Sequence, residues 1–176
     1  MGRINTDFMH PFPEPNAESL ENLQMLVPPF EKFLENENDA AKNDENGKVA
    51  PETIEGLKPM GAYGIMTPEE YGGVGMDHTG YARLVEAVGA NDLGLGITLG
   101  AHQSIGYKGI VLYGTEEQKS KYLPSLASGD VSAAFCLTEP GSGSDAQSIK
   151  TRAVPAEDGS GDFILNGGKS EPPRTV

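Results

Sequence analysis

The chain has 176 residues, of which 37% are hydrophobic, and its 26 acidic and 13 basic residues give a net charge of −13. This length allows one large or two small domains, and so acidic a surface disfavours binding to nucleic acids or to anionic membranes. The single cysteine, Cys136, excludes an internal disulfide and a cysteine cluster for zinc.

The first part of the chain has the pattern of helices. Residues 1–17 are rich in proline and have no hydrophobic period, which predicts a disordered lead-in. The next segment predicts an amphipathic helix interrupted near Pro28 and Pro29. Its apolar residues recur at helical spacing: Leu20, Leu23, Val27, Phe30 and Leu34. The charged run 35–48 is interpreted as a solvated loop or a short helix end.

Two further helices are expected before residue 90. Pro51 marks the start of a short helix that Gly61 or Gly64 follows. The glycine-rich run 72–75 after Pro68 is typical of turns. Thr79 is then the expected N-cap of a helix, one face of which carries Tyr81, Leu84, Val85 and Val88.

The stretch from Gly94 to Gly114 is mostly apolar but contains many glycines, which destabilise a helix relative to alanine. A buried, tightly packed helix from about Ile97 is the preferred interpretation, and a helix broken by loops stays open as the alternative. After this stretch, Thr115 and Gln118 have the spacing of a capping box, and the helix that they begin is expected to end at Pro124, before a short second helix to Ala127.

From Asp130 onward the pattern favours strands, namely "VSAAFCLTE" and "DFILNG", with a tight turn at Asn166-Gly167. Between these runs lies "LTEPGSGSD", a loop of small residues with hydroxyl groups at Thr138, Ser142 and Ser144. Its unshielded backbone N–H groups suit a flat polar ring or an anionic phosphate. On spacing alone, an ordinary loop between two strands is the favoured alternative.

Several sequence blocks together resemble one family. "FCLTEPGSGSDAQSIKTRA" is similar to the signature segment of the acyl-CoA dehydrogenases, and three other blocks follow the family order: "GAYGIMTPEEYGGVGMDHTGYARLVEAVG", "LGAHQSIGYKGIVLYGTEEQKSKYLPSLASGD" and "FILNGGK". The resemblance covers roughly residues 27–169. Within the family, "GITLGAHQSIGYKGI" and "NDAAKND" are most similar to the very-long-chain branch.

The resemblance implies an α+β fold. Residues 18–130 would form the all-α N-terminal domain, and residues 131–169 would form the first strands of the β-barrel-like middle domain. Residues 170–176 depart from the family pattern, because Lys169 is followed by "SEPPRTV" instead of a Trp-Ile-Ser/Thr element. The C-terminal helical domain of the family is then expected to be absent.

The resemblance also implies a chemistry. In the family, the matching segment lines FAD, and these residues are the expected cofactor contacts: Phe135, Cys136, Leu137, Thr138, Glu139, Pro140, Gly141, Ser142, Gly143 and Ser144. Thr138 would lie at the pyrimidine edge of the flavin, and Ser144 would also contact the substrate, a fatty acyl-CoA. The reaction is α,β-dehydrogenation in mitochondrial fatty-acid β-oxidation, and the electrons pass to electron-transfer flavoprotein.

The family works as a homo-oligomeric flavoprotein oxidoreductase, and the resemblance implies the same for a complete relative. No catalytic residue and no metal ligand is assigned here, because the family's base glutamate belongs to the C-terminal domain. The chain is therefore predicted to be a truncated form that is inactive alone. The alternatives are a non-catalytic fragment that binds partner subunits through the Gly94–Gly114 stretch, or another chain-length class of acyl-CoA dehydrogenase or oxidase.

Overall fold

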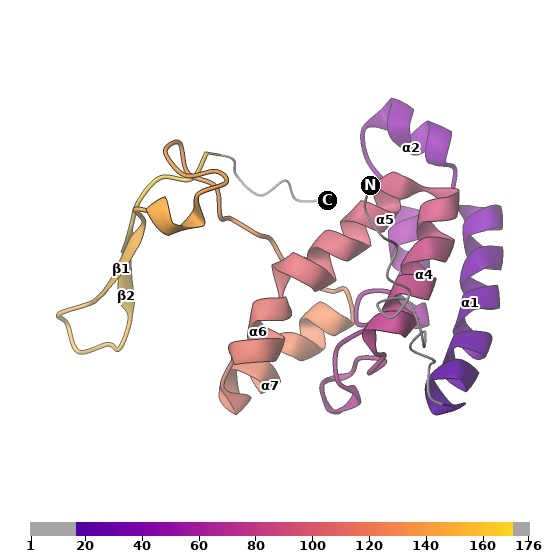
Figure 1. The fold of residues 1–176 in the computed structure, drawn as a ribbon, viewed down its shortest axis with the longest axis horizontal. Coiled ribbons are helices and arrows are strands. Elements are labelled where there is room, and N and C mark those ends of the chain that lie inside the picture. The colour runs from indigo at the N-terminus through magenta and orange to yellow at the C-terminus, as the bar shows by residue number, and fades with distance from the viewer. Residues whose placement is uncertain (1–16, 171–176) are drawn as a thin grey trace, which may run out of the picture.

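The computed structural model of the protein describes residues 17–170. A body of packed helices comes first in the chain, and a β-hairpin projects from one side of it (Figure 1). The α+β expectation is thus confirmed as helices followed by two antiparallel strands. The disordered lead-in expected for residues 1–17 lies outside the described residues except for Ala17, as does the tail after Ser170.

The helices of the described part differ widely in length. The α-helices are α1 (Ala17–Glu37), α2 (Ala40–Asn46), α3 (Pro51–Leu57), α4 (His78–Asn91), α5 (Leu93–Gly100), α6 (Lys108–Tyr113) and α7 (Glu116–Ala127). A π-helical turn, Ala101–Gly106, joins α5 to α6. Short 3₁₀ turns lie at Lys58–Met60, Glu69–Tyr71 and Ala146–Ser148. The strands are β1 (Arg152–Pro155) and β2 (Phe163–Asn166).

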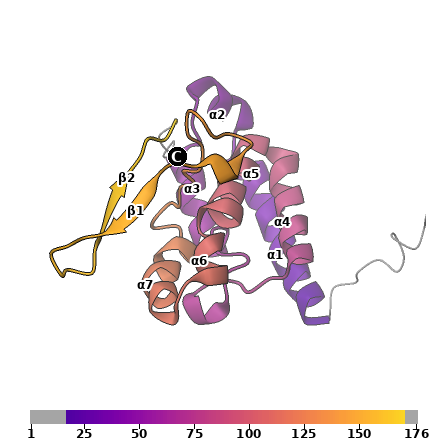
Figure 2. The same cartoon turned by 60° about the vertical axis from the view of Figure 1, so that its left-hand side comes forward.

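The core lies where α4 packs between α1 and α5, an arrangement visible in Figure 2. Burial of apolar side chains is the main force that holds such a body together. The first hydrophobic cluster includes Phe30, Leu34, Leu57, Ile65, Leu84, Leu95 and Leu99. A second cluster, under α6 and α7, contains Tyr71, Tyr107, Leu123 and Leu126. The apolar pattern of α1 is confirmed from Leu23 to Leu34, whereas Leu20 is exposed.

Helix α1 runs without interruption through Pro28 and Pro29, so the expected break is wrong. Both prolines are exposed, while the neighbouring Val27 and Phe30 are buried in the core. A proline removes the hydrogen bond to the carbonyl four residues earlier. These carbonyls belong to residues on the exposed side of α1, where water can replace the missing donor. Packing of the buried face therefore keeps the helix continuous.

The caps of α4 and α7 correct one expectation and confirm another. Asp77, two residues before Thr79, accepts a hydrogen bond from the Gly80 N–H and caps α4. The capping box of α7 is confirmed, because Thr115 and Gln118 bond each other's backbone N–H groups. Pro124 lies inside α7 and does not end it.

The Gly94–Gly114 stretch is helical up to Tyr113, but a π-helical turn and not a loop interrupts its α-helix, so neither a single helix from about Ile97 nor a helix broken by loops is confirmed. It consists of α5, the π-helical turn and α6. Leu95, Leu99 and Tyr107 are buried, but the expectation that the whole stretch is buried is wrong. Five large apolar side chains on α5, the π-helical turn and α6 are exposed: Leu93, Ile97, Ile105, Leu112 and Tyr113. We call these five residues the α5–α6 apolar face.

The β region differs from the expected strand order. Residues 132–138 form no strand, because a strand requires a ladder of backbone hydrogen bonds, and in the described chain the backbone of this segment makes one backbone–backbone bond, from the Ser170 N–H to the Thr138 carbonyl. The two real strands pair antiparallel from Arg152–Asn166 to Pro155–Phe163. The hairpin turn lies between Pro155 and Phe163, where Gly159 and Gly161 have positive φ, and not at Asn166-Gly167.

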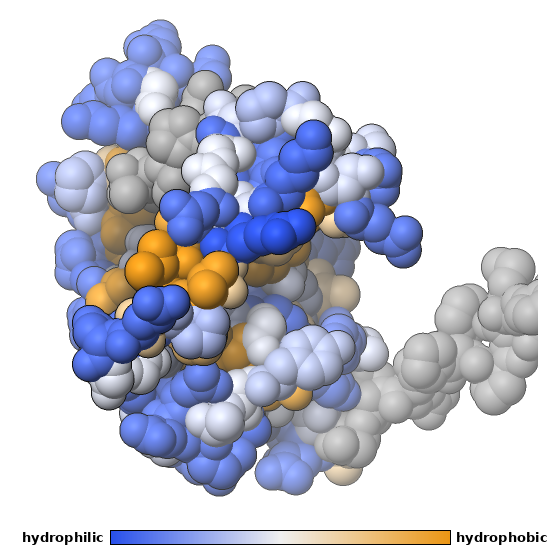
Figure 3. Space-filling model, turned by 90° about the vertical axis from the view of Figure 1, so that its left-hand side faces the viewer, coloured by the Kyte–Doolittle hydropathy of each residue, from blue (hydrophilic) through white to orange (hydrophobic). Residues whose placement is uncertain are grey.

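The hairpin is exposed on both faces. Three consecutive residues of β2, namely Phe163, Ile164 and Leu165, are all more than half exposed, and so is Val154 on β1. Figure 3 looks at the side from which the hairpin projects, and orange hydrophobic atoms gather there among blue hydrophilic ones. Two strands cannot bury an apolar face by themselves.

Candidate functional site

The site segment, residues 133–144, leaves the helical body after α7 and leads into the hairpin. Gly129 has a positive φ and lies against the Tyr63 ring, so the chain turns sharply after α7. The extended residues then pass the π-helical turn, where Ala133 packs against Tyr107 and its neighbours. The helical body therefore fixes where the site segment begins.

Glu139 holds the far end of the part of the segment that precedes the glycine loop, residues 133–139. Its carboxylate is almost completely buried and accepts hydrogen bonds from the N–H groups of Lys150 and Thr151 at 2.8 and 3.0 Å. It also accepts a bond from the Thr151 hydroxyl and pairs with Lys169 Nζ at 3.0 Å. We call these four residues, Glu139, Lys150, Thr151 and Lys169, the Glu139 clamp.

The clamp determines the charge of Glu139. The hydrogen bond from the Thr151 hydroxyl, followed by that from the Lys150 N–H, lowers the pKa of Glu139 to about 2. Donors to a carboxylate stabilise its ionised form. Glu139 is therefore an anion at neutral pH whose lone pairs are already engaged. These contacts give Glu139 a structural role in the loop.

The loop after Glu139 is tightly closed. Glu139 and Ser142 exchange two backbone hydrogen bonds of 3.0 Å. The Ser142 hydroxyl is buried and donates to the Asp145 carbonyl at 2.5 Å. Lys169 Nζ donates to the Leu137 carbonyl at 3.1 Å, and the Ser170 N–H donates to the Thr138 carbonyl at 3.0 Å. These contacts connect the segment to residues thirty positions later in the chain.

Other groups of the segment have no partner within the described residues. The backbone N–H groups of residues 135–138 and the hydroxyls of Thr138 and Ser144 make no hydrogen bond in that part of the chain. A Cβ placed on Gly141 or Gly143 would find no atom within 4 Å. The segment thus presents donors and small residues to open space, while the clamp holds its end in place.

The ten predicted contact residues therefore fall into two groups. Glu139 and Ser142 are buried and hold the loop, and Leu137 is half-buried. The exposed ones, which remain available to a ligand, are Phe135, Cys136, Thr138, Pro140, Gly141, Gly143 and Ser144. Sequence reasoning missed Thr151 and His102. The sequence signal for Thr151 was weak. It consisted only of Glu139 in the same motif, an acid that needs hydrogen-bond donors if it is buried.

His102, on the π-helical turn, contacts both α7 and the start of the site segment. Among residues 17–170, no group of three or more His, Cys, Asp or Glu side chains is arranged to hold a metal ion. Within the same residues, none of the helices combines the length and the apolar character needed to cross a membrane.

The sequence profile of the family "Acyl-CoA dehydrogenase, N-terminal domain" matches residues 21–130, which is more than half of the chain. The chain belongs to the acyl-CoA dehydrogenase family. It is 57% identical over 169 residues to the "Very long-chain specific acyl-CoA dehydrogenase, mitochondrial" of Homo sapiens, an alignment that covers 96% of this chain. The chain spans about a quarter (26%) of the length of that curated relative.

Solved structures agree with this assignment. The fold is similar to that of an acyl-CoA dehydrogenase complexed with FAD from Bacillus anthracis, with a TM-score of 0.74 and 39% identity over 85% of this chain and 26% of the other. A chain in the structure of the electron transferring flavoprotein of Acidaminococcus fermentans matches with a TM-score of 0.76 and 37% identity, covering 90% of this chain and 40% of that one.

Proposed function

We propose that residues 135–144 form one side of an FAD and acyl-CoA site of the very-long-chain type. The observation that carries this proposal is the contrast within the segment. Its Glu139 end is held by four donors, while the backbone N–H groups of residues 135–138 and two hydroxyls are free of partners among the described residues. A held backbone with open donors is pre-organised for a planar polar ligand.

The open residues fit FAD. Absence of a Cβ at Gly141 and Gly143 lets a ring or a phosphate approach the backbone. The free N–H and hydroxyl of Thr138 are donors suited to the carbonyl groups of a flavin pyrimidine edge, and the Ser144 hydroxyl is left for the acyl-CoA. When bound, FAD supplies the acceptor of the hydride that leaves the acyl chain.

The acids of this region are poor candidates for the base. Glu139 is engaged by the clamp, and its pKa is lowered to about 2, first by the Thr151 hydroxyl. The Asp145 carboxylate accepts bonds from the Gln147 N–H at 3.2 Å and from the Ser148 hydroxyl at 2.5 Å. We infer that the segment binds and orients, and that the 176-residue chain alone does not dehydrogenate acyl-CoA.

The finer parts of the proposal are supported by the relatives. Their names support a very-long-chain acyl-CoA substrate and a mitochondrial location for a protein of this kind. The match in the electron transferring flavoprotein structure supports such a flavoprotein as the electron acceptor. Fatty-acid β-oxidation is the process that these substrates and acceptors serve in the family.

Flavin binding is tested by titrating the purified chain with FAD and following flavin fluorescence. We expect binding, and a weakening of about tenfold in Thr138→Val, because one hydrogen bond to a ligand is lost. Thr79→Val is the matched control, since Thr79 is also exposed but lies on α4. Equal affinities of the two variants would contradict the role of Thr138.

Turnover is a separate test. Palmitoyl-CoA and an artificial electron acceptor are added to the FAD-loaded chain, and reduction of the acceptor is followed. We expect none, because no acid of the segment is free to remove the α-proton. Measurable turnover by the chain alone would overturn this part of the proposal.

The second candidate function, association with partner subunits, is favoured by the α5–α6 apolar face. Tyr113 is 86% exposed and Leu93 68%, so this face carries large apolar side chains in contact with water. We expect the chain to co-purify with the full-length very-long-chain enzyme of Homo sapiens, and Ile97→Lys to abolish this. Ser120→Lys, which adds the same single positive charge at an exposed position of α7, is the control. If the chain is a monomer and does not co-purify with the full-length enzyme, this function is excluded.

A further inference from the structure

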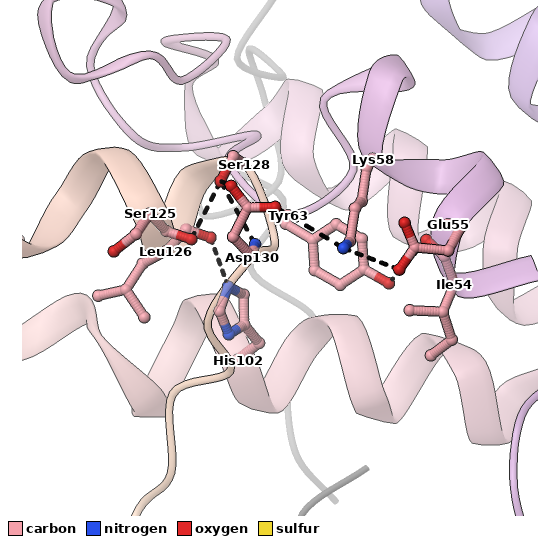
Figure 4. A network of polar contacts seen from close by, with 9 residues as sticks. All are labelled: Ile54, Glu55, Lys58, Tyr63, His102, Ser125, Leu126, Ser128 and Asp130. Atoms are coloured by element: carbon pink, nitrogen blue, oxygen red, sulfur yellow. Dashed lines mark hydrogen bonds and ion pairs between the residues drawn. The ribbon is translucent and has the colours of Figure 1, made fainter. Parts of the chain in front are cut away.

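His102 is a buried histidine of the helical body that connects it to the site segment. It lies on the π-helical turn between α5 and α6 and is 5% exposed. Its Nε2 atom lies 2.8 Å from the Leu126 carbonyl oxygen, near the end of α7. The Ala133 N–H donates to its Nδ1 atom at 3.0 Å. Figure 4 shows the bond between His102 and Leu126.

These two bonds require one form of the imidazole. Nδ1 accepts from the Ala133 N–H, so it carries no proton, and Nε2 must then carry the proton that it donates to Leu126. Neutral His102 with its proton on Nε2 satisfies both partners. In the imidazolium form Nδ1 also carries a proton. Two N–H groups would then face each other, and the hydrogen bond from Ala133 to His102 would be lost.

The hydrogen bond between His102 and Ala133 lies in a part of the chain that makes few other hydrogen bonds. Val131 N–H donates to the Ser125 carbonyl at 3.1 Å, and the next bonds along the chain are those of Leu137 and Thr138 to Lys169 and Ser170. Within the described chain, residues 134–136 therefore lie between two attachments: His102 on one side and the Glu139 clamp on the other. Movement of either attachment moves these residues.

We propose that neutral His102 is a positioning residue, which sets the start of the flavin-contacting segment through the Ala133 N–H. This inference rests on the proposed function of residues 135–144, but the position of the segment is measurable without a flavin. His102 acts through the backbone that it holds and touches neither ligand. A purely structural histidine would matter to the helical body and would leave the segment unchanged.

The surroundings of His102 favour its neutral form. The rings of Tyr63 and Tyr107 lie edge-on at 5.7 and 4.9 Å, and burial raises the pKa of each to about 12, so both are uncharged. Beyond Tyr63, Lys58 pairs with Glu55 and Asp130 (Figure 4). Asp130 also accepts from the Ser128 hydroxyl. These charges are engaged with one another, and burial lowers the pKa of His102 below its ordinary value.

Two substitutions separate the two bonds of the ring. His102→Asn places an amide oxygen near the position of Nδ1 and keeps an acceptor for Ala133, whereas His102→Gln places its amide near Nε2 and keeps only the contact with Leu126. Amide hydrogen exchange at Ala133 and along residues 134–138 is measured by NMR in a series of pH values from 7.5 down to 4, because burial lowers the pKa of His102 below its ordinary value. His78→Gln is the control, because His78 is exposed in the first turn of α4.

We expect the protection factor of Ala133 to fall about tenfold in His102→Gln, as expected for one lost hydrogen bond, and to stay near the wild-type value in His102→Asn. In the wild type, protection should decrease as the pH is lowered far enough to protonate His102, and in His102→Asn it should not. Equal protection in His102→Gln and wild type, or equal loss in both variants, would overturn the proposal. If neither variant folds, a wild-type profile that does not change with pH overturns it.

FAD titration of the same proteins distinguishes this inference from the proposed function. Weaker FAD binding by about tenfold in His102→Gln, with His102→Asn unaffected, supports both. If Ala133 responds as described but the wild type binds no FAD, the positioning role stands and the flavin assignment fails. If the wild type binds FAD and His102→Gln binds it equally, the positioning role fails and the flavin assignment stands.

Discussion

The helical body and the region after residue 130 are stabilised in different ways. In the body, side chains such as Phe30, Leu84 and Leu123 are almost completely buried, and capping side chains bond the helix ends. After residue 130, no apolar side chain of the described chain is buried, and the buried residues are Glu139 and Ser142. The comparison teaches that apolar burial builds the body, whereas polar contacts shape the candidate site.

The largest expected effect is a loss of stability of the helical body, and a substitution in the hairpin is its control. Leu84 on α4 is completely buried in the first cluster. Leu84→Ala removes buried methyl groups and leaves a cavity, which lowers the free energy of unfolding by about 2–5 kcal/mol. The measurement is urea unfolding followed by far-UV circular dichroism. Leu165→Ala, at a residue 72% exposed, should change it by less than about 0.5 kcal/mol, and equal effects would refute the comparison.

The next effect is confined to the site segment. Glu139→Gln removes the charge that Lys169 and three other donors contact. We expect exchange of the Lys150 and Thr151 amides to become about tenfold faster, and the unfolding curve of the helices to stay the same. Glu157→Gln, at an exposed acid of the hairpin loop, is the matched control. A large loss of helix stability would show that the two regions are not independent.

A smaller effect tests the capping of the body. Thr115→Ala removes the side-chain acceptor of the capping box of α7, while Gln118 keeps its own bond to the backbone. The expected loss is about 1 kcal/mol in the free energy of unfolding, measured by urea unfolding. Thr79→Ala is the control, because Asp77 and not Thr79 caps α4. A larger loss in Thr79→Ala would contradict the assignment of that cap.

The most gradual effect is the response to acid. Burial lowers the pKa of His102, so its contribution to stability is complete above its unfolded value of 6.5 and is lost as the pH falls below it. The clamp, through the Thr151 hydroxyl first, lowers the pKa of Glu139 from 4.5 to about 2, so that contribution is lost between these values. Acidification should therefore release the His102 end of the segment first, observed by amide exchange in two steps. Release in the reverse order would contradict this assignment.

Much of the body could be predicted because its information is local. The apolar residues of α1 from Leu23 to Leu34 recur at helical spacing, and the Thr115 capping box involves residues three positions apart. The break at Pro28 was wrong because a propensity argument does not include packing of the opposite face. The strand at residues 131–139 was wrong because an extended pattern does not supply a neighbour.

The site was predictable in its composition but not in its organisation. Three hydroxyls were recognised on a bare loop; Thr138 and Ser144 are exposed, whereas Ser142 is buried and donates to the Asp145 carbonyl. The donors that hold Glu139 come from residues 11 to 30 positions later. The acceptor that holds Ala133 comes from His102, which is 31 positions earlier. No spacing rule connects such residues, because the chain between them follows the path that the core allows.

The sequence by itself determined the helical periodicity, the capping box, the bare loop and, through its motifs, the family. Only the tertiary structure decided that α1 continues through two prolines, that the α5–α6 apolar face is exposed, and that His102 and Lys169 hold the two ends of the candidate site segment. The physical reason is the distance along the sequence between the residues that interact. Periodicity and caps act within a few residues of one another, whereas burial and the satisfaction of buried polar groups depend on every element packed around them.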